Sequence, residues 1–223
     1  MNLRIFDSSD DLAAAAARTI EQRLAGRQTA VVGVSGGSTP RRLYEVLNAR
    51  KSLASTAVTW IVVDERFVPE DDPQSNAAAI GRTLFGGGLP ASHRFLRFDT
   101  SLADAAQSAS AFESDWQRMR LDRLDVVILG CGEDGHTASL FPGTPVLDVE
   151  DRIASEVFVP RLDQWRVTLT FPIIRAAALR IVLATGASKA AVLREVREGA
   201  DLPIVRATEG GETWWFVDRE AAG

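Results

Sequence analysis

Cysteine and histidine are scarce in this chain, which has one cysteine and two histidines among 223 residues. The single cysteine, Cys131, cannot form a disulfide within the chain, and it excludes a structural zinc site built on several cysteines. So low a cysteine content is typical of a reducing compartment. The two histidines, His93 and His136, lack the spacing of metal ligands, so the sequence predicts no metal site and no cofactor.

Long apolar runs, basic blocks and a secretion signal are also missing. No run approaches the ~20 apolar residues that a membrane-spanning helix needs, and residues 1–7 lack a charged-then-apolar signal pattern. The net charge of −5 argues against binding to nucleic acid or to an anionic membrane surface. We therefore expect a cytoplasmic protein, a monomer or small homo-oligomer, that holds any anionic ligand with a local cluster of cations and backbone N–H groups.

Strand-like and helix-like segments alternate along the chain. Apolar, β-branched or alternating runs predict strands at residues 3–6, 29–34, 58–63, 93–98, 124–129, 153–159, 166–171, 180–185 and 213–217. Helices are predicted at residues 12–24, 41–47, 76–84, 102–120, 172–178 and 186–199. This alternation is typical of α/β proteins. We predict a single domain over residues 1–223, with a doubly wound, largely parallel, Rossmann-like sheet flanked by helices.

The strongest functional signal is the glycine-rich turn at residues 130–136, directly after the apolar strand at 124–129. Its glycines let the backbone turn sharply and approach a ligand closely. Asp134 and His136 lie two residues apart inside this turn. Because open α/β sheets bind ligands at the carboxyl ends of their strands, the sequence predicts an active site here.

A second glycine-rich loop follows the strand at residues 29–34 and precedes a helix that Pro40 begins. Unpaired N–H groups and the helix dipole at such a position favour a phosphate. A plain strand-to-helix turn capped by Thr39 is the alternative interpretation. The loop consists of Ser35, Gly36, Gly37, Ser38 and Thr39.

Charged residues follow several of the other predicted strands. Asp64 and Arg66 come directly after an apolar strand, and Lys189 follows a strand and a glycine turn. Arg166 lies at the start of an alternating strand. A solvated strand end or a surface lysine would explain the same positions without a ligand. His93 has neither a carboxylate nor a glycine turn beside it, so we predict a structural role for it.

The residues Gly130, Gly132 and Gly135 also match the spacing of the dinucleotide-binding fingerprint. That fingerprint requires a long helix after its third glycine. Pro142 and Gly143 would end such a helix within about two turns. We therefore exclude nicotinamide dinucleotide binding.

Five segments together resemble the 6-phosphogluconolactonase family, and they occur in the family's order. They are residues 34–40, 64–66 with 75–76, 129–143, 166–170 and 186–189. The chain departs from the family at residues 163–165, where a proline-rich lead-in is expected. The resemblance implies a carboxylic ester hydrolase of the oxidative pentose phosphate pathway, which opens 6-phospho-D-glucono-1,5-lactone with water to give 6-phospho-D-gluconate.

The reaction that the resemblance implies needs an activated water, stabilisation of the carbonyl oxygen and a proton for the departing ring oxygen. His136 is the candidate general base, because an imidazole ordinarily titrates near pH ~6.5. Asp134 would orient the imidazole or stabilise its cationic form. Arg66 would stabilise the oxyanion or hold the substrate. Ser139 lies outside a Gly-x-Ser-x-Gly elbow, so no acyl-enzyme is predicted.

The same resemblance places the sugar phosphate on residues 35–39, with Lys189 and Arg166 supplying positive charge and Asp64 contacting the substrate. Two rival functions stay open. Related glucosamine-6-phosphate deaminases and isomerases have a glutamate five residues after the histidine, where this chain has Phe141. A sugar-phosphate-binding module without catalysis is the other. The hydrolase function requires His136 and the loop at residues 35–39 to open into a common cleft.

Overall fold

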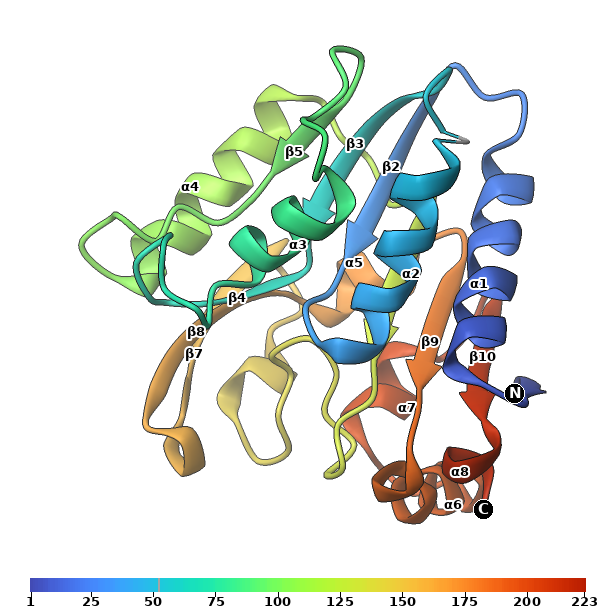
Figure 1. Cartoon of the computed structure of the whole chain (residues 1–223). Coiled ribbons are helices and arrows are strands. Elements are labelled where there is room, and N and C mark those ends of the chain that lie inside the picture. The colour runs from blue at the N-terminus through green and yellow to red at the C-terminus, as the bar shows by residue number, and fades with distance from the viewer. Residues whose placement is uncertain (52) are drawn as a thin grey trace.

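The computed structural model describes residues 1–51 and 53–223, and within them the chain forms two β-sheets with helices around them (Figure 1). The larger sheet has seven strands, and each strand runs parallel to its neighbours. In spatial order they are β1 (Asn2–Phe6), β10 (Thr213–Asp218), β9 (Arg180–Ala184), β6 (Val126–Gly130), β2 (Thr29–Val34), β3 (Ala57–Val62) and β5 (Arg94–Leu96). The predicted α/β class with a largely parallel sheet is confirmed.

A second, antiparallel sheet of three strands lies beside the first. It contains β4 (Asp64–Arg66), β8 (Gln164–Leu169) and β7 (Ala154–Val159), in that order. The sequence predicted the two longer strands but did not separate them from the parallel sheet. The short connection between them explains the difference, because parallel neighbours need a crossover of roughly a dozen residues or more.

Helices cover both sheets. They are α1 (Ser9–Leu24), α2 (Ser38–Arg50), α3 (Asn76–Leu84), α4 (Ala105–Arg118), α5 (Phe171–Ala176), α6 (Ala190–Glu198), α7 (Pro203–Ala207) and α8 (Arg219–Ala222), with 3₁₀ turns η1 (Pro145–Asp148), η2 (Pro160–Leu162) and η3 (Ala187–Lys189). Helices α1 and α2 lie side by side on the larger sheet (Figure 1), and α4 packs against β7 and β8. The short helices α7 and α8 were not predicted.

Several predicted boundaries shift by a few residues. Helix α4 starts later than the predicted residue 102 because the side chain of Asp104 caps it, accepting a hydrogen bond from the backbone N–H of Gln107. The predicted helix at residues 186–199 begins as the 3₁₀ turn η3 and ends at Gly199, which adopts a φ of 79°. Such C-terminal glycines end helices because they reach positive φ without steric cost.

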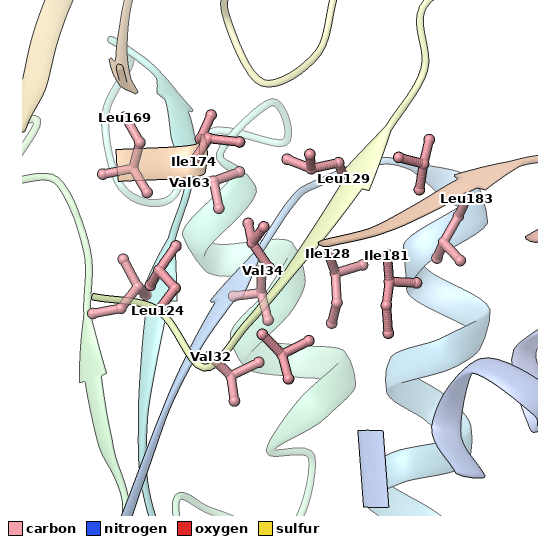
Figure 2. Packing of buried hydrophobic residues seen from close by; sticks show 14 of the residues in the cluster. Val32, Val34, Val63, Leu124, Ile128, Leu129, Leu169, Ile174, Ile181 and Leu183 are labelled. Atoms are coloured by element: carbon pink, nitrogen blue, oxygen red, sulfur yellow. The ribbon is translucent and has the colours of Figure 1, made fainter. Parts of the chain in front are cut away.

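Apolar side chains from β2, β6 and β9 form the centre of the core, as Figure 2 shows for Val32, Ile128 and Ile181. Strand β6 is apolar from Val126 to Leu129 because a central parallel strand is buried on both faces. Polar and glycine residues begin where these strands leave the core, at Ser35 after β2 and at Gly130 on β6. The glycine-rich loops therefore meet at the carboxyl edge of the sheet.

None of the helices in the described part of the chain is both long and apolar enough to cross a membrane.

A buried carboxylate fixes the start of α3 against β4. Glu65 is 1% exposed; burial raises the pKa of its carboxyl group, and hydrogen bonds from backbone N–H groups oppose this rise. Its oxygens accept hydrogen bonds from the backbone N–H groups of Arg66, Asn76 and Ala77 and from the Ser75 hydroxyl. The solvated strand end considered above for the charged residues after this strand is therefore wrong at Glu65.

We expect Glu65→Ala to lower the free energy of unfolding by ~1–3 kcal/mol, because it leaves buried N–H groups at the start of α3 without acceptors. Urea unfolding followed by circular dichroism measures the change. Glu70→Ala is the matched control, since Glu70 is exposed and pairs with the half-exposed Arg97, and it should change stability by less than ~0.5 kcal/mol. Equal stability of the two variants would contradict this role of Glu65.

Candidate active site

A cavity of about 230 Å³ opens at the carboxyl edge of the larger sheet. It is lined by the predicted residues Ser35, Gly36, Gly37, Ser38, Thr39, Asp64, Arg66, His136, Arg166 and Lys189, and also by Pro40, Asn76, Gly130, Cys131, Gly132, Thr137, Ala138 and Leu183. Of the predicted site residues, only Asp134 does not line the cavity, and it contacts His136 instead. The expected common cleft for His136 and the loop at residues 35–39 is therefore present.

The turn after β6 folds His136 back over its own backbone. The N–H of Gly132 donates to the carbonyl of His136 (2.8 Å), and the Thr137 hydroxyl donates to the carbonyl of Gly130 (2.9 Å). Gly135 has a φ of 75°, a conformation that glycine adopts without steric cost. A Cβ at Gly132 would lie 2.0 Å from Nδ1 of His136. Glycine at residue 132 is thus required for the position of the imidazole.

The spacing of Asp134 and His136 produces a direct hydrogen bond. Nδ1 of His136 lies 2.5 Å from Oδ1 of Asp134, and Nη2 of Arg161 lies 2.6 Å from the other carboxylate oxygen. Burial opposes ionisation of Asp134, but the hydrogen bonds from His136 and the nearby positive charges outweigh it and lower the pKa of Asp134 to about 2. An ionised carboxylate only accepts hydrogen bonds, so Nδ1 carries the proton and Nε2 is the acceptor of a neutral ring.

The ring of Phe141 covers one face of the imidazole. The two ring centroids lie 4.1 Å apart with an angle of 26° between the planes. The guanidinium groups of Arg161 and Arg166 lie 5.0 and 5.3 Å from the centroid of Phe141, within the range of cation–π attraction. Residue 141, where the resemblance implies a glutamate in the related deaminases and isomerases, is therefore a buried phenyl ring that has no proton to transfer.

The loop at residues 35–39 leaves the first turn of α2 without a side-chain cap. The residue before the helix is Gly37, with a φ of 107°, and among the described residues no side chain caps this helix. The hydroxyl of Thr39 instead shares a hydrogen bond with that of Thr185 (2.7 Å). The alternative of a turn capped by Thr39 is wrong, and the positive end of the α2 dipole faces the cavity.

Two hydrogen bonds fix this loop to neighbouring elements of the fold. The hydroxyl of Ser35 donates to the carbonyl of Ile128 (2.7 Å), and the Tyr44 hydroxyl donates to the carbonyl of Ser35 (2.7 Å). A Cβ at Gly36 would lie 1.9 Å from Oδ1 of Asn76. The side chain of Ser35 thus anchors the loop to β6, and Gly36 allows α3 to approach it.

Three cations line the cavity. Arg166 is buried, its Nη1 lies 4.0 Å from Oδ2 of Asp64, and burial lowers the pKa of its guanidinium. The Nε atoms of Arg66 and Arg166 are buried and have no hydrogen-bond partner in the described residues. Lys189 lies with its Nζ 4.0 Å from an oxygen of Glu133. Incomplete pairing of buried cations is costly, so the cavity favours an anion.

Asp64 is held by residues that the sequence did not single out for binding. Ser139 is fully buried and donates to Oδ2 of Asp64 (2.7 Å), and Asn76 donates to the carbonyl of Asp64 (2.8 Å). Because Ser139 is separated from Asp64 by 75 residues, no local pattern could have revealed this pair. Arg161 was missed for the same reason.

The single cysteine and the second histidine of the chain lie in different environments. Cys131 lines the cavity, but burial raises the pKa of its thiol to about 12, so it is not a nucleophile near neutral pH. His93 lies outside the cavity, where its Nδ1 accepts from Nε1 of Trp60 (3.2 Å) and its Nε2 bonds to the carbonyl of Leu53 (3.2 Å). Both nitrogens of His93 are thus occupied, as a structural role requires.

We expect Gly132→Ala to displace the imidazole of His136, because the added Cβ would overlap Nδ1 and lie 2.7 Å from Oδ1 of Asp134. Gly130→Ala is the control, since a Cβ there meets no atom of the described chain within 4 Å. The ¹H–¹³C spectrum of the two imidazoles measures the effect. The signals of His136 should move in the first variant only, while those of His93 stay fixed, and an unmoved His136 would contradict the steric argument.

The match to known proteins covers nearly the whole chain. The family model described as glucosamine-6-phosphate isomerases/6-phosphogluconolactonase matches residues 7–215. A 6-phosphogluconolactonase of Rattus norvegicus is 35% identical, over 99% of this chain and 92% of the rat protein. A solved 6-phosphogluconolactonase of Leishmania guyanensis superposes with a TM-score of 0.83 at 30% identity, covering 99% of this chain and 97% of that one.

A solved monomeric glucosamine-6-phosphate deaminase also superposes, with a TM-score of 0.84, over 100% of this chain and 99% of that chain. At 22% identity this likeness shows the fold alone. Membership of a family is shown instead by sequence similarity to the family model, the rat relative and the Leishmania protein. The chain belongs to the glucosamine-6-phosphate isomerase/6-phosphogluconolactonase family.

Proposed function

We propose that this protein is a 6-phosphogluconolactonase, which opens 6-phospho-D-glucono-1,5-lactone with water to give 6-phospho-D-gluconate. One observation carries the proposal: a single cavity contains His136, which is bonded to an ionised Asp134, together with an uncapped helix N-terminus and three cations. A substrate with a phosphate at one end and an ester at the other matches this arrangement. The relatives that bear this name span almost the whole chain.

In this mechanism His136 acts as the general base through Nε2. Nε2 takes a proton from water while the water oxygen attacks the lactone carbonyl carbon, and the bond from that carbon to the ring oxygen then breaks. The imidazolium returns the proton to the departing ring oxygen. Proton transfer of this kind contributes ~10²–10⁴-fold in rate. Asp134 stays ionised because its pKa is about 2, so it holds the Nδ1–H tautomer and stabilises the imidazolium.

The cations divide between the two ends of the substrate. Arg66 stabilises the negative charge that develops on the carbonyl oxygen, because it lines the cavity and its Nη1 is held in place by the carbonyl of Gln74 (2.6 Å). The phosphate binds at residues 35–39, where Lys189 and Arg166 supply charge. Asp64, fixed by Ser139, accepts a hydrogen bond from a sugar hydroxyl.

We also propose that residues 1–223 form one domain, because the cavity takes residues from both sheets. Arg66 and Arg166 face each other in the register of β4 and β8, while Ser35 and Gly130 follow or end strands of the larger sheet. Separation of the sheets would divide the proposed site.

Deamination or isomerisation of glucosamine 6-phosphate is the second candidate, since that activity occurs within the same family. Phe141 disfavours it, because a phenyl ring stacked on His136 cannot transfer the proton that the glutamate of those enzymes transfers.

We expect His136→Ala to lower kcat for the lactone by ~10²–10⁴-fold, because the general base is lost. Disappearance of the lactone, corrected for spontaneous hydrolysis, measures the rate, and ammonia release from glucosamine 6-phosphate measures the alternative. Circular dichroism should show an unchanged fold. Equal rates for variant and wild type would overturn the base assignment, and binding without turnover by the wild type would make the protein a binding module.

Lys189→Ala should raise KM for the lactone more than it lowers kcat, because a ground-state phosphate contact contributes to binding before the chemistry. The loss of one hydrogen bond to a charged group, ~1.5–3 kcal/mol, corresponds to an increase of roughly 10–100-fold in KM. Lys51→Ala is the matched control, since Lys51 is the other lysine of the chain and does not line the cavity. A change confined to kcat would count against the phosphate contact.

A further inference from the structure

Arg161 is a charged neighbour of Asp134 that comes from the smaller sheet. It lies in η2, at the tip of the hairpin between β7 and β8, and its side chain is 54% exposed. The tip is shaped by Pro160, which begins η2, and by Asp163, which has a φ of 47° and donates its N–H to the carbonyl of Pro160. This hairpin is the segment that lacks the proline-rich lead-in.

Two contacts connect Arg161 to the candidate base. Its Nη2 lies 2.6 Å from Oδ2 of Asp134, the oxygen that His136 does not use. Its guanidinium also lies 5.0 Å from the centroid of Phe141, whose ring stacks on the imidazole. Arg161 is not among the residues that line the cavity. We therefore expect Arg161 to act on a substrate chiefly through its contacts with Asp134 and Phe141.

Stability does not explain this arrangement well, because a half-exposed ion pair contributes little to folding. Its geometric effect is larger. Without Arg161, Asp134 is held by the described residues only at Oδ1, which accepts from Nδ1 and from the backbone N–H of His136. A carboxylate held at one oxygen can tilt about that oxygen, whereas donors at both oxygens fix its plane. The plane of Asp134 in turn sets the direction of the Nδ1–H bond of His136, and therefore the direction in which Nε2 points.

We propose that Arg161 is a positioning residue for lactone opening: it holds the second oxygen of Asp134 and the ring of Phe141, and so keeps His136 in the Nδ1–H tautomer with Nε2 directed into the cavity. This inference rests on the function proposed above. The β7–β8 hairpin would thus contribute to catalysis by positioning His136, although the hairpin tip does not line the cavity.

Steady-state kinetics separate positioning from substrate binding. Arg161→Ala should lower kcat for the lactone about tenfold, because small misplacements of a catalytic group are costly. KM should change less than about twofold, because Arg161 does not line the cavity. Arg161→Lys should restore part of kcat, since it keeps the charge but not the forked geometry. Arg97→Ala, which removes another half-exposed arginine of an ion pair, should leave both constants unchanged.

A double-mutant cycle with Asp134→Asn tests whether Arg161 acts through the carboxylate. If it does, adding Arg161→Ala to the Asp134→Asn variant should lower kcat by less than twofold, because the shared partner is already lost. A full tenfold further loss would show that the carboxylate of Asp134 is not the route, and would overturn the inference that Arg161 positions His136 through it.

The imidazole spectrum gives a readout that does not depend on turnover. At a pH where the rings are neutral, ¹⁵N shifts should report the Nδ1–H tautomer for His136 in the wild type and a mixture of tautomers in Arg161→Ala. The shifts of His93, which is bonded to Trp60 and Leu53, should stay unchanged in both. Unmoved His136 shifts together with a wild-type kcat, or a raised KM at constant kcat, would overturn the positioning role. Absence of lactone turnover by the wild type would overturn the proposed function instead, and the tautomer of His136 in the variant would still decide what Arg161 holds.

Discussion

The proposed site depends on the parallel alignment of three neighbouring strands. In the larger sheet β6 lies between β2 and β9, and all three point the same way. Three segments therefore begin side by side at the carboxyl ends of these strands. They are the loop at residues 35–39, the turn with His136 and the segment that leads to Lys189. The apolar cores of these strands (Figure 2) hold the three loops at fixed spacing. The relative positions of the three loops are thus fixed by the backbone of the sheet.

The smaller sheet completes the site by redirecting the chain after β3. One residue, Val63, separates the end of β3 from β4, which pairs antiparallel with β8. This change of direction places Arg66 opposite Arg166, and it buries Glu65 under the start of α3. Burying a carboxylate is costly unless its hydrogen bonds are satisfied. Here they are, so the cost is offset while β4 and α3 stay aligned beneath the cavity.

The arginines of the chain illustrate how hydrogen-bond pairing distinguishes a structural role from the proposed binding role. Arg180 is fully buried, yet its guanidinium donates to three oxygens, those of Thr213, Arg175 and Gly210. Arg66 and Arg166 are held at fewer positions, and their buried Nε atoms have no partner in residues 1–51 and 53–223. A guanidinium satisfied by the protein fixes the fold, whereas one left partly unpaired beside a cavity is ready for an anion.

By itself the sequence determined the α/β class, the positions of the main strands and many of the residues that line the cavity. These features are local: apolar β-branched runs make buried strands, and glycines with polar residues after them make loops at the carboxyl edge. Only the tertiary structure decided the separate antiparallel sheet, the bond from Ser139 to Asp64, and the contacts of Arg161 and Phe141 around His136. Those contacts join residues that are distant in sequence or face each other only after the turn has folded, so strand pairing and packing had to bring them together before their chemistry existed.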